Sequence, residues 1–326
     1  MSSSFKKLKI CTLQSSYEGS NAPFKELDLY CDPSIHMPEH SWTKVFIKKA
    51  NAVQQIRDLA KEGYDLFVNL CDGAFDEDRA GKEVLEALER FNCAYTGADL
   101  NFYEPSKETM KMVALYYGVN TPAFKFAYNQ ADIDDAVKFM KFPMIVKHYN
   151  GYSSVGMTKD SRVTNPEQLK TQAWRFIDEF GGALIEEFID GQEYTCLIAE
   201  NAIDPNNPIA YNPIQCVFSE GDAGFKHFDL KWADCSKIGW VPCDNEELSN
   251  RIKNLCKKIF VALDGASYGR CDLRVNNKGE VFFLEINPNC GIFYPTESPE
   301  TMGSADFILI NDPKGHRGFM EHIFNW

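Results

Sequence analysis

The residues best suited to chemistry in this chain fall in one segment, residues 268–296, with the sequence YGRCDLRVNNKGEVFFLEINPNCGIFYPT. Its two apolar runs, residues 268–275 and 280–286, are rich in β-branched and aromatic residues and flank an Asn-Asn-Lys-Gly turn. This pattern predicts an antiparallel hairpin, which would bring the guanidinium, carboxylate and amide groups of both runs together.

The polar side chains of the two predicted strands share matching faces. Because side chains alternate along a strand, Arg270 and Asp272 share one face of the first strand, and Glu285 and Asn287 share one face of the second. Solvated polar positions are the simpler interpretation, but Glu285 follows the apolar run VFFL, where an unpaired carboxylate would be costly to bury. Mg²⁺ typically takes one or two protein carboxylates together with water and phosphate oxygens. We therefore predict that Asp272, Glu285 and Asn287 hold Mg²⁺ against a phosphate-bearing ligand.

The order of these residues carries a family resemblance. GRCDLRV followed by FFLEINPNCGI resembles the C-terminal signature of the ATP-grasp enzymes, and most closely that of the D-alanine–D-alanine ligase family. The likeness covers about residues 5–296 and is close only after residue 105. It implies an α/β (α+β) chain with the three-lobed ATP-grasp fold, in which an N-terminal parallel βαβ lobe precedes two lobes that clamp ATP.

The resemblance also implies a reaction, the ATP-dependent ligation of a carboxylate to an amine. The first substrate's carboxylate would attack the γ-phosphate to give an acylphosphate and ADP, and the second substrate's amine would then displace phosphate. ATP and Mg²⁺ are the implied cofactors, with two ions and with Mn²⁺ as an alternative metal. Arg270 and the backbone amide around Gly291 would stabilise the oxyanion of the tetrahedral intermediate. Thr296 falls where relatives place a hydroxyl that binds the second substrate's carboxylate.

Length and composition fit this expectation and exclude other classes. A chain of 326 residues predicts two or three cooperating lobes. The formal charge of −13 argues against a nucleic-acid partner, which needs clustered lysine and arginine. No apolar run is long enough to span a bilayer, and the N-terminus lacks the apolar core of a signal peptide. Eleven cysteines without a CxxC pair fit a reducing compartment, so we expect a cytoplasmic protein with no membrane partner. A homodimer is left open.

Residues 1–104 predict an N-terminal lobe in which strands and helices alternate, hence a small parallel sheet covered by helices. The predicted strands are residues 8–14, 64–70 and 93–96, the predicted helices are residues 41–62 and 77–91, and a linker follows at residues 97–105.

Residues 105–185 predict the central lobe. Its first helix runs from a cap at Ser106 to Gly118, and its last is capped by Asn165 and opened by Pro166. Its predicted strands are residues 123–127, 143–148 and 156–159, with a further helix at residues 132–140.

The loop GYSSVG at residues 151–156 has the glycine spacing of a Walker P-loop, with Met157 where the lysine belongs. We reject that interpretation because the loop leads into a predicted strand, so no helix N-terminus faces a phosphate. Its amides and the hydroxyls of Ser153 and Ser154 still form a candidate anion-binding nest. By resemblance, Lys147 at the end of the preceding strand and Lys107 are the lysines that bind the ATP phosphates.

Residues 186–326 predict the C-terminal catalytic lobe. By resemblance, the strand ending at Ile189 is the hinge that binds adenine through its backbone, with Glu186 or its neighbour Glu187 near the base. Glu193 would accept hydrogen bonds from the ribose hydroxyls. Glu187 stands where relatives commonly carry lysine, so contacts on that side of the base are left open.

A polar stretch at residues 221–240 predicts a long loop, and loops of this length in a compact enzyme are often lids. By resemblance this is the mobile loop that closes the site, with Lys231 reaching the γ-phosphate. Trp232 stands where a tyrosine that bonds to the loop serine is usual, so we expect Ser153 to lose that partner. Predicted strands at residues 193–199 and 209–217 precede the loop, and a helix capped by Asp244 follows it.

The region expected to hold the first substrate departs from the family. D-alanine ligases keep a histidine after the second strand of the first lobe, and Cys71 stands at that position here. Glu18, in the altered turn after the first strand, is expected to orient Ser153. Cysteine is a weak hydrogen-bond donor, whereas the nearby Asp72 and Asp76 favour an amine-bearing substrate. We therefore predict that the donor is another amino acid or amine-bearing acid, with a drifted D-alanine site as the alternative.

Three other functions stay open from the sequence. In a different ATP-grasp ligase, the acyl group of the acylphosphate would pass to a thiol or hydroxyl instead of an amine. Acceptor screening combined with a hydroxamate trap distinguishes these acceptors. A catalytically silent nucleotide-binding protein or a scaffold would have no reason to retain the full set of lysine, aspartate, glutamate and asparagine. Two small-molecule substrates, a carboxylate and an amine, are the expected partners.

Overall fold

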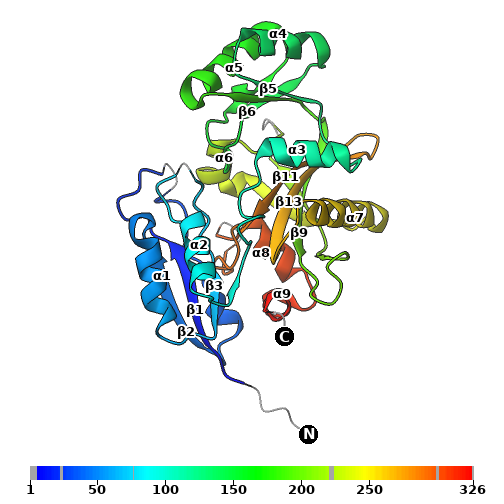
Figure 1. Ribbon diagram of the computed structural model, residues 1–326. Helices are drawn as coiled ribbons and strands as arrows, with labels where there is room; N and C mark the ends of the chain where they lie inside the picture. Colours follow the sequence, from blue (N-terminus) through cyan, green and yellow to red (C-terminus); the bar gives the residue numbers. More distant parts are fainter. Residues whose placement is uncertain (1–5, 23–24, 76, 220–223, 299–300, 325–326) are drawn as a thin grey trace.

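The computed structural model describes residues 6–22, 25–75, 77–219, 224–298 and 301–324. These residues form three lobes, each built on one β-sheet. In Figure 1 the N-terminal lobe is blue to cyan, the central lobe is green at the top, and the C-terminal lobe runs from yellow-green through yellow to red. The predicted three-lobed α/β fold is confirmed.

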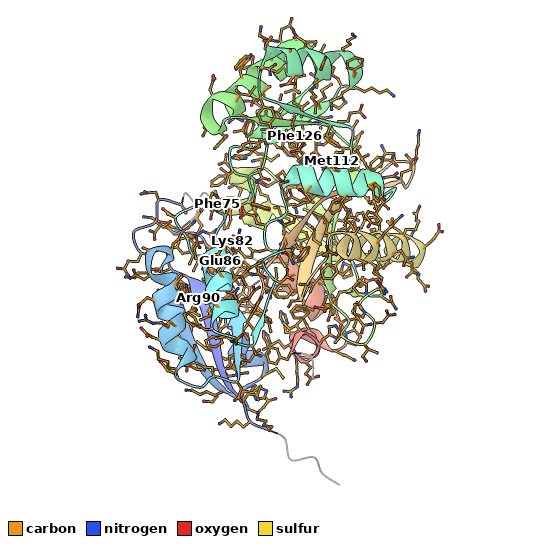
Figure 2. All side chains as sticks on the ribbon, in the orientation of Figure 1. Phe75, Lys82, Glu86, Arg90, Met112 and Phe126 are labelled. Carbon is orange, nitrogen blue, oxygen red and sulfur yellow. The ribbon has the colours of Figure 1, made fainter. Side chains whose placement is uncertain are left out.

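The N-terminal lobe has a parallel sheet in the order β2-β1-β3-β4. Helix α2 shows why its helices cover this sheet: Val84 and Leu88 are fully buried, while Lys82, Glu86 and Arg90 lie on successive turns of its exposed face (Figure 2). The elements are β1 (Lys9–Ser15), β2 (Ser41–Ile47), β3 (Leu66–Asn69), β4 (Tyr95–Thr96), α1 (Ala52–Ala60) and α2 (Lys82–Arg90).

The helix predicted over residues 41–62 is wrong in its first part. Residues 41–47 form β2, which pairs in parallel with β1 from Lys9↔Ser41 to Ser15↔Ile47, and the α-helix begins only at Ala52. The sequence SWTKVFI is rich in β-branched and aromatic residues, which suit a strand that pairs along its full length. The helix predicted over residues 77–91 begins at Lys82, after Gly81.

The central lobe has an antiparallel sheet in the order β5-β8-β6-β7. Asn129 and Asn165 cap its two helices by accepting hydrogen bonds from the backbone amides three residues further on. The strand predicted at residues 156–159 is wrong, because Thr158 and Ser161 form a capping box that starts a 3₁₀ turn instead. The elements are β5 (Phe124–Ala127), α4 (Gln130–Phe139), β6 (Met144–His148), β7 (Arg162–Val163), α5 (Pro166–Phe180) and β8 (Ala183–Glu187).

The C-terminal lobe has a sheet in the order β12-β11-β9-β13-β14, with β10 paired to β9. Helix α3 (Lys107–Tyr116), which the sequence assigned to the central lobe, packs against this sheet: Met110 and Ala114 share a core with Phe283 and Ile286. The strands are β9 (Gly191–Ala199), β10 (Ile209–Ala210), β11 (Ile214–Phe218), β12 (Ile238–Pro242), β13 (Tyr268–Asn276) and β14 (Val281–Pro288). The helices are α6 (Phe228–Trp232), α7 (Glu246–Ala262), α8 (Ser304–Ile310) and α9 (Gly315–Ile323).

The predicted polar loop over residues 221–240 is wrong over much of its length. Residues 220–223 lie outside the described residues, and the rest contains α6, a 3₁₀ turn (Cys235–Lys237) and the start of β12. The predicted cap of α7 is off by one residue, since Asn245 rather than Asp244 accepts from the Leu248 amide. The hairpin of β13 and β14 is confirmed, and Gly279 in its turn has a φ of +78°.

Gly191 begins β9 where that strand meets β13, and it has a φ of +151°. A Cβ atom there would lie 2.0 Å from the Val275 carbonyl oxygen. We expect Gly191→Ala to lower the free energy of unfolding by about 1–3 kcal/mol, because the backbone has to move. Gly239→Ala in β12 is the control, since its Cβ would be 3.6 Å from the nearest atom, the Val217 Cβ. Denaturant unfolding measures both, and equal stability of the two variants would contradict the packing argument.

Candidate active site

A cavity of about 380 Å³ lies between the lobes and takes residues from all three. Fourteen of the predicted site residues line it: Lys107, Lys147, Ser153, Ser154, Glu186, Glu187, Ile189, Glu193, Lys231, Arg270, Asp272, Glu285, Asn287 and Gly291. The fold therefore gathers into one cavity residues that are up to 184 positions apart, from Lys107 to Gly291.

The pairing of β13 with β14 sets the geometry of the predicted metal ligands. Asp272 lies opposite Glu285 and Arg270 lies opposite Asn287, and a β-bulge follows directly after Asp272. Arg270 and Asn287 donate to Asp272 Oδ2 at 3.2 and 3.1 Å, and the Thr195 hydroxyl donates to Oδ1 at 2.8 Å. Burial alone would raise the pKa of Asp272, but Arg270 and a nearby lysine outweigh it and hold the pKa well below its usual range.

The facing carboxylate, Glu285, forms an ion pair with Lys107 from the start of α3. Burial would raise the pKa of Glu285, but Lys107 and Lys147 lower it overall. Both carboxylates are therefore ionised at neutral pH, as metal ligands must be. No group of three or more His, Cys, Asp and Glu side chains that could hold a metal occurs among the described residues. Two carboxylates and the Asn287 amide nevertheless fit Mg²⁺, which completes its coordination with water and phosphate oxygens.

Glu186 is buried between two lysines, so its carboxylate is not available to contact adenine. Lys111 Nζ is 2.5 Å from Oε1, and Lys147 Nζ is 2.6 Å from Oε2. Burial would raise the pKa of Glu186, but the two lysines lower it to about 2. The carboxylate therefore fixes the end of Lys147 in the cavity. Neighbouring Glu187, whose Oε1 accepts from the Lys141 amide, is only partly buried.

Glu193 is held by two cations that the sequence interpretation missed. Lys226 Nζ is 2.9 Å from Oε1, and Arg274 donates from Nη1 to Oε2 at 3.2 Å. Arg274 follows Arg270 and Asp272 on the same face of β13, so the alternation of side chains that identified those two would also have found it. Lys226 has no comparable signal, because it reaches the cavity from the segment before α6.

Helix α6 brings Lys231 and Trp232 to the cavity. Burial lowers the pKa of Lys231 to about 8, and the positive charges of Arg270 and Lys226 contribute. The Trp232 indole donates to the carbonyl oxygen of Ser153 at 3.2 Å. The sequence led us to expect that the Ser153 hydroxyl loses its partner at residue 232, and this contact is indeed to the Ser153 backbone rather than to its hydroxyl.

The structure does not bring three predicted substrate residues to the cavity. Cys71 is fully buried in the N-terminal core, and Glu18 points outward to pair with Lys48 at 2.7 Å. Thr296 does not line the cavity, whereas the hydroxyl residues Thr301 and Ser304 of the same segment do. The Cys71 side chain packs inward because its neighbours in that core are apolar, which the local sequence does not show.

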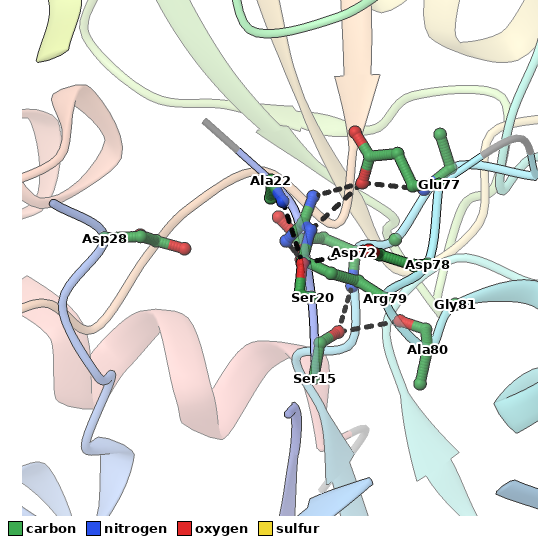
Figure 3. Close-up of polar contacts among 12 residues, drawn as sticks. Ser15, Ser20, Ala22, Asp28, Asp72, Glu77, Asp78, Arg79, Ala80 and Gly81 are labelled. Atoms are coloured by element: carbon green, nitrogen blue, oxygen red, sulfur yellow. Dashed lines mark hydrogen bonds and ion pairs between the residues drawn. The ribbon is translucent and has the colours of Figure 1, made fainter. Parts of the chain in front are cut away.

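The N-terminal wall of the cavity instead carries a network around Arg79 (Figure 3). Arg79 Nη1 donates to Asp72 at 2.7 Å, and its Nε and Nη2 donate to Glu77 at 3.0 and 2.7 Å. From the sequence, Asp72 and Asp76 were expected to add negative charge that favours an amine-bearing donor. In the structure Asp72 pairs with Arg79, but that guanidinium is shared with Glu77, so a net negative charge is left, and Asp76 lies outside the described residues.

Lysine and arginine side chains thus surround paired carboxylates on a hairpin, between two lobes that could enclose a nucleotide. This fold and division of charge define the ATP-grasp class of ATP-dependent carbon–nitrogen ligases. The family model described as D-ala D-ala ligase C-terminus matches residues 113–302, more than half of the chain. The chain therefore belongs to the D-alanine–D-alanine ligase family, in which ATP and Mg²⁺ are the general cofactors.

Individual relatives agree with this family. The chain is 25% identical over 244 residues to a D-alanine–D-alanine ligase of Cupriavidus pinatubonensis, covering 74% of this chain and 71% of the relative. It is 27% identical over 221 residues to a D-alanine–D-alanine ligase of Aquifex aeolicus, covering 66% and 68%.

Solved structures share the fold at low sequence identity. A D-alanine–D-alanine ligase from Bacillus anthracis complexed with ATP superposes with a TM-score of 0.68 at 17% identity, covering 98% of this chain and 96% of that one. The VanG D-Ala:D-Ser ligase from Enterococcus faecalis superposes with a TM-score of 0.65 at 14% identity, covering 98% of each chain. Helices of the described residues are all too short or too polar to cross a membrane.

Glu186, Lys111 and Lys147 form a buried triad, and we predict that its contribution to stability depends on pH. Glu186→Gln should lower the free energy of unfolding by about 3–5 kcal/mol at neutral pH, because two lysines lose their buried counter-ion. The pKa of Glu186 is depressed on folding, so its contribution is fully present above pH 4.5 and is lost as pH falls toward about 2.

Denaturant unfolding of the parent and Glu186→Gln at a series of pH values measures this difference. Glu187→Gln is the matched control, because its Oε1 still accepts from the Lys141 amide and its side chain is less buried. A constant difference between parent and Glu186→Gln from pH 7 down to pH 3 would rule out the ionised triad.

Proposed function

We propose that this chain forms an amide or dipeptide bond between two small molecules through an acylphosphate, and that its donor substrate is not D-alanine. The observation that carries the proposal is the arrangement of Lys107, Lys147 and Lys231 around the paired carboxylates Asp272 and Glu285 in one cavity. Such an arrangement suits phosphoryl transfer, in which the protein mainly positions reactants and neutralises charge.

Each group has a role in this proposal. Asp272, Glu285 and Asn287 would hold two Mg²⁺ ions, which when bound neutralise phosphate charge. Lys147 and Lys107 would bind phosphate oxygens. The pKa of Lys231 is lowered by burial and by nearby positive charge, and a bound phosphate would raise it again and keep the side chain protonated.

The nucleoside and the reacting carbonyl need further contacts. The backbone from Glu187 to Ile189 would bind adenine, because the Glu186 carboxylate is already engaged by lysines, and Glu193 would accept from the ribose. Arg270, whose Nε has no hydrogen-bond partner among the described residues, would stabilise the developing oxyanion together with the Gly291 amide. The Trp232–Ser153 contact would hold the loop over the site and exclude water.

The lobes would divide this work. We propose residues 1–104 as the substrate lobe, residues 105–185 as the central ATP-grasp lobe and residues 186–326 as the catalytic lobe, with α3 packed on the last of these. A cytoplasmic location and a possible homodimer complete the proposal, the former on the cysteine composition.

The departure from D-alanine is supported by the N-terminal wall of the cavity. Cys71 is buried at the position where D-alanine ligases keep a histidine, and Glu18 pairs with Lys48. In their place Asp28, Arg79 and Tyr294 face the cavity.

The metal ligands give a direct prediction. Glu285→Gln or Asp272→Asn should reduce turnover by roughly two or more powers of ten, because charge stabilisation of a transferring phosphoryl group is lost. ADP formation with saturating Mg²⁺ measures this, and thermal melts check that the variants fold. Glu280→Gln, an exposed carboxylate in the turn of the same hairpin, is the control. Full activity in Glu285→Gln would remove Glu285 from the metal site.

The donor is tested by supplying D-alanine as the only amino acid. We expect little or no ADP formation, because the Cys71 and Glu18 positions no longer contact a donor in the cavity. Other amino acids in both enantiomers, paired with each other, should include combinations that release phosphate from ATP. Robust D-alanyl-D-alanine synthesis, at rates on the order of 1 s⁻¹ as expected for a native substrate, would refute the proposal.

A further inference from the structure

The cavity has two walls of opposite charge. Among the described residues, the wall that would face the ATP phosphates has six cations against five carboxylates, so its net charge is slightly positive: Lys107, Lys147, Lys226, Lys231, Arg270 and Arg274, with Glu186, Glu187, Glu193, Asp272 and Glu285. The N-terminal wall is acidic, and its charged side chains are four carboxylates and one guanidinium: Asp28, Asp72, Glu77, Glu104 and Arg79. A substrate bound between the walls therefore meets positive charge at one end and net negative charge at the other.

Arg79 does not cancel this negative charge. Its side chain is only 5% exposed, and its guanidinium is already shared between Asp72 and Glu77, with a further bond from Nη1 to the Tyr17 hydroxyl at 3.2 Å. One positive charge faces two carboxylates within hydrogen-bonding distance. Arg79 therefore fixes the wall in place and leaves it negative.

Asp28 is a carboxylate of this wall that forms no ion pair with a cation of the described residues. The hydroxyls of Tyr17 and Tyr294 donate to its two oxygens, the second at 2.8 Å, and no lysine or arginine of the described residues forms an ion pair with it. A carboxylate offers about four acceptor positions, so two bonds leave room for a ligand. In Figure 3 Asp28 comes from a separate segment and lies across from the Arg79 network.

A small side chamber opens next to Asp28. Its volume is about 40 Å³, and it shares Asp28, Asp72, Arg79 and Tyr294 with the main cavity. A water molecule occupies about 30 Å³ of liquid, so the chamber has room for one small group at the end of a chain. Carboxylates and tyrosine hydroxyls on its walls suit a primary ammonium group, which has three donors and no acceptor.

We propose that this chamber binds a second ammonium group, carried on the side chain of the donor, so that the donor is a diamino acid and Asp28 determines this specificity. The inference rests on the proposed ligase function. The donor's carboxylate has to point to the cationic wall to reach the γ-phosphate. Its single α-ammonium would use only part of the acidic wall, whereas a second one meets the unpaired charge of Asp28.

The experiment measures donor activation without knowing the acceptor. Hydroxylamine replaces it: its nitrogen attacks the acyl carbon of the acylphosphate, phosphate leaves, and a hydroxamate forms. The purified full-length chain with ATP and Mg²⁺ is given diamino acids and their uncharged isosteres in both enantiomers. The pairs are 2,3-diaminopropionate with 2-aminobutyrate, 2,4-diaminobutyrate with norvaline, and ornithine with norleucine.

We expect one diamino acid to exceed its isostere at least about tenfold in kcat/KM for hydroxamate formation, as for a charged hydrogen bond gained. Asp28→Asn should bring that ratio close to one while the affinity for ATP, measured by calorimetry, is unchanged. Asp58→Asn, which alters an exposed carboxylate on α1 of the same lobe, should keep the ratio of the parent.

Two results would overturn the inference alone: isosteres that react as well as the diamino acids, or an Asp28→Asn variant that slows both members of a pair equally. Absence of hydroxamate with every amino acid would overturn the proposed function as well. The comparison of donors uses the unaltered protein, so it decides whether the donor is a diamino acid even if Asp28→Asn does not fold.

Discussion

The pairing of β13 with β14 is the constraint on which the site depends. β13 is paired along its length with β9 on one side and with β14 on the other, so it cannot shift without breaking both ladders. A shift of one residue would turn every side chain to the opposite face and remove Arg270, Asp272 and Arg274 from the cavity together. The bulge after Asp272 ends the regular register just where Asp272 faces Glu285. The geometry of the candidate metal site is therefore a property of the sheet rather than of flexible loops.

Around this hairpin, each buried carboxylate of the nucleotide side already has a cation. Glu186 is paired with two lysines, Glu193 with Lys226 and Arg274, and Glu285 with Lys107. Charges buried without partners would be costly, so the pairs allow a highly charged site to exist before a ligand binds. The lysines also lower the pKa values of Glu186 and Glu285, which keeps these two carboxylates ionised. Binding of a metal and a triphosphate would then exchange partners within an existing network rather than create charge in an apolar cavity.

The N-terminal wall of the cavity, proposed to face the donor, has fewer cations than carboxylates among the described residues. There Arg79 is shared between carboxylates, and the rest of the acidic wall, including Asp28, is left to face the cavity. Family membership fixes the ATP chemistry, because the hairpin, Lys147 and Lys231 lie within residues 113–302, which the family model covers, whereas Lys107 lies just before that match. The N-terminal lobe, outside that match, is where the residues differ. Under the proposed function, this separation would let the same catalytic frame act on a donor other than D-alanine.

The sequence by itself determined the fold class, the hairpin and most of the nucleotide side. Alternation along β13 and β14 placed Arg270, Asp272, Glu285 and Asn287 on matching faces, because a strand's period of two needs no knowledge of distant residues. Local pattern failed where distant contacts decide. Residues 41–47 became a strand because β1 lies beside them, and Cys71 turned into the core because apolar neighbours surround it. Tertiary packing alone brings Lys226, Arg79 and Asp28 to the cavity, because these residues come from segments that are distant in the sequence.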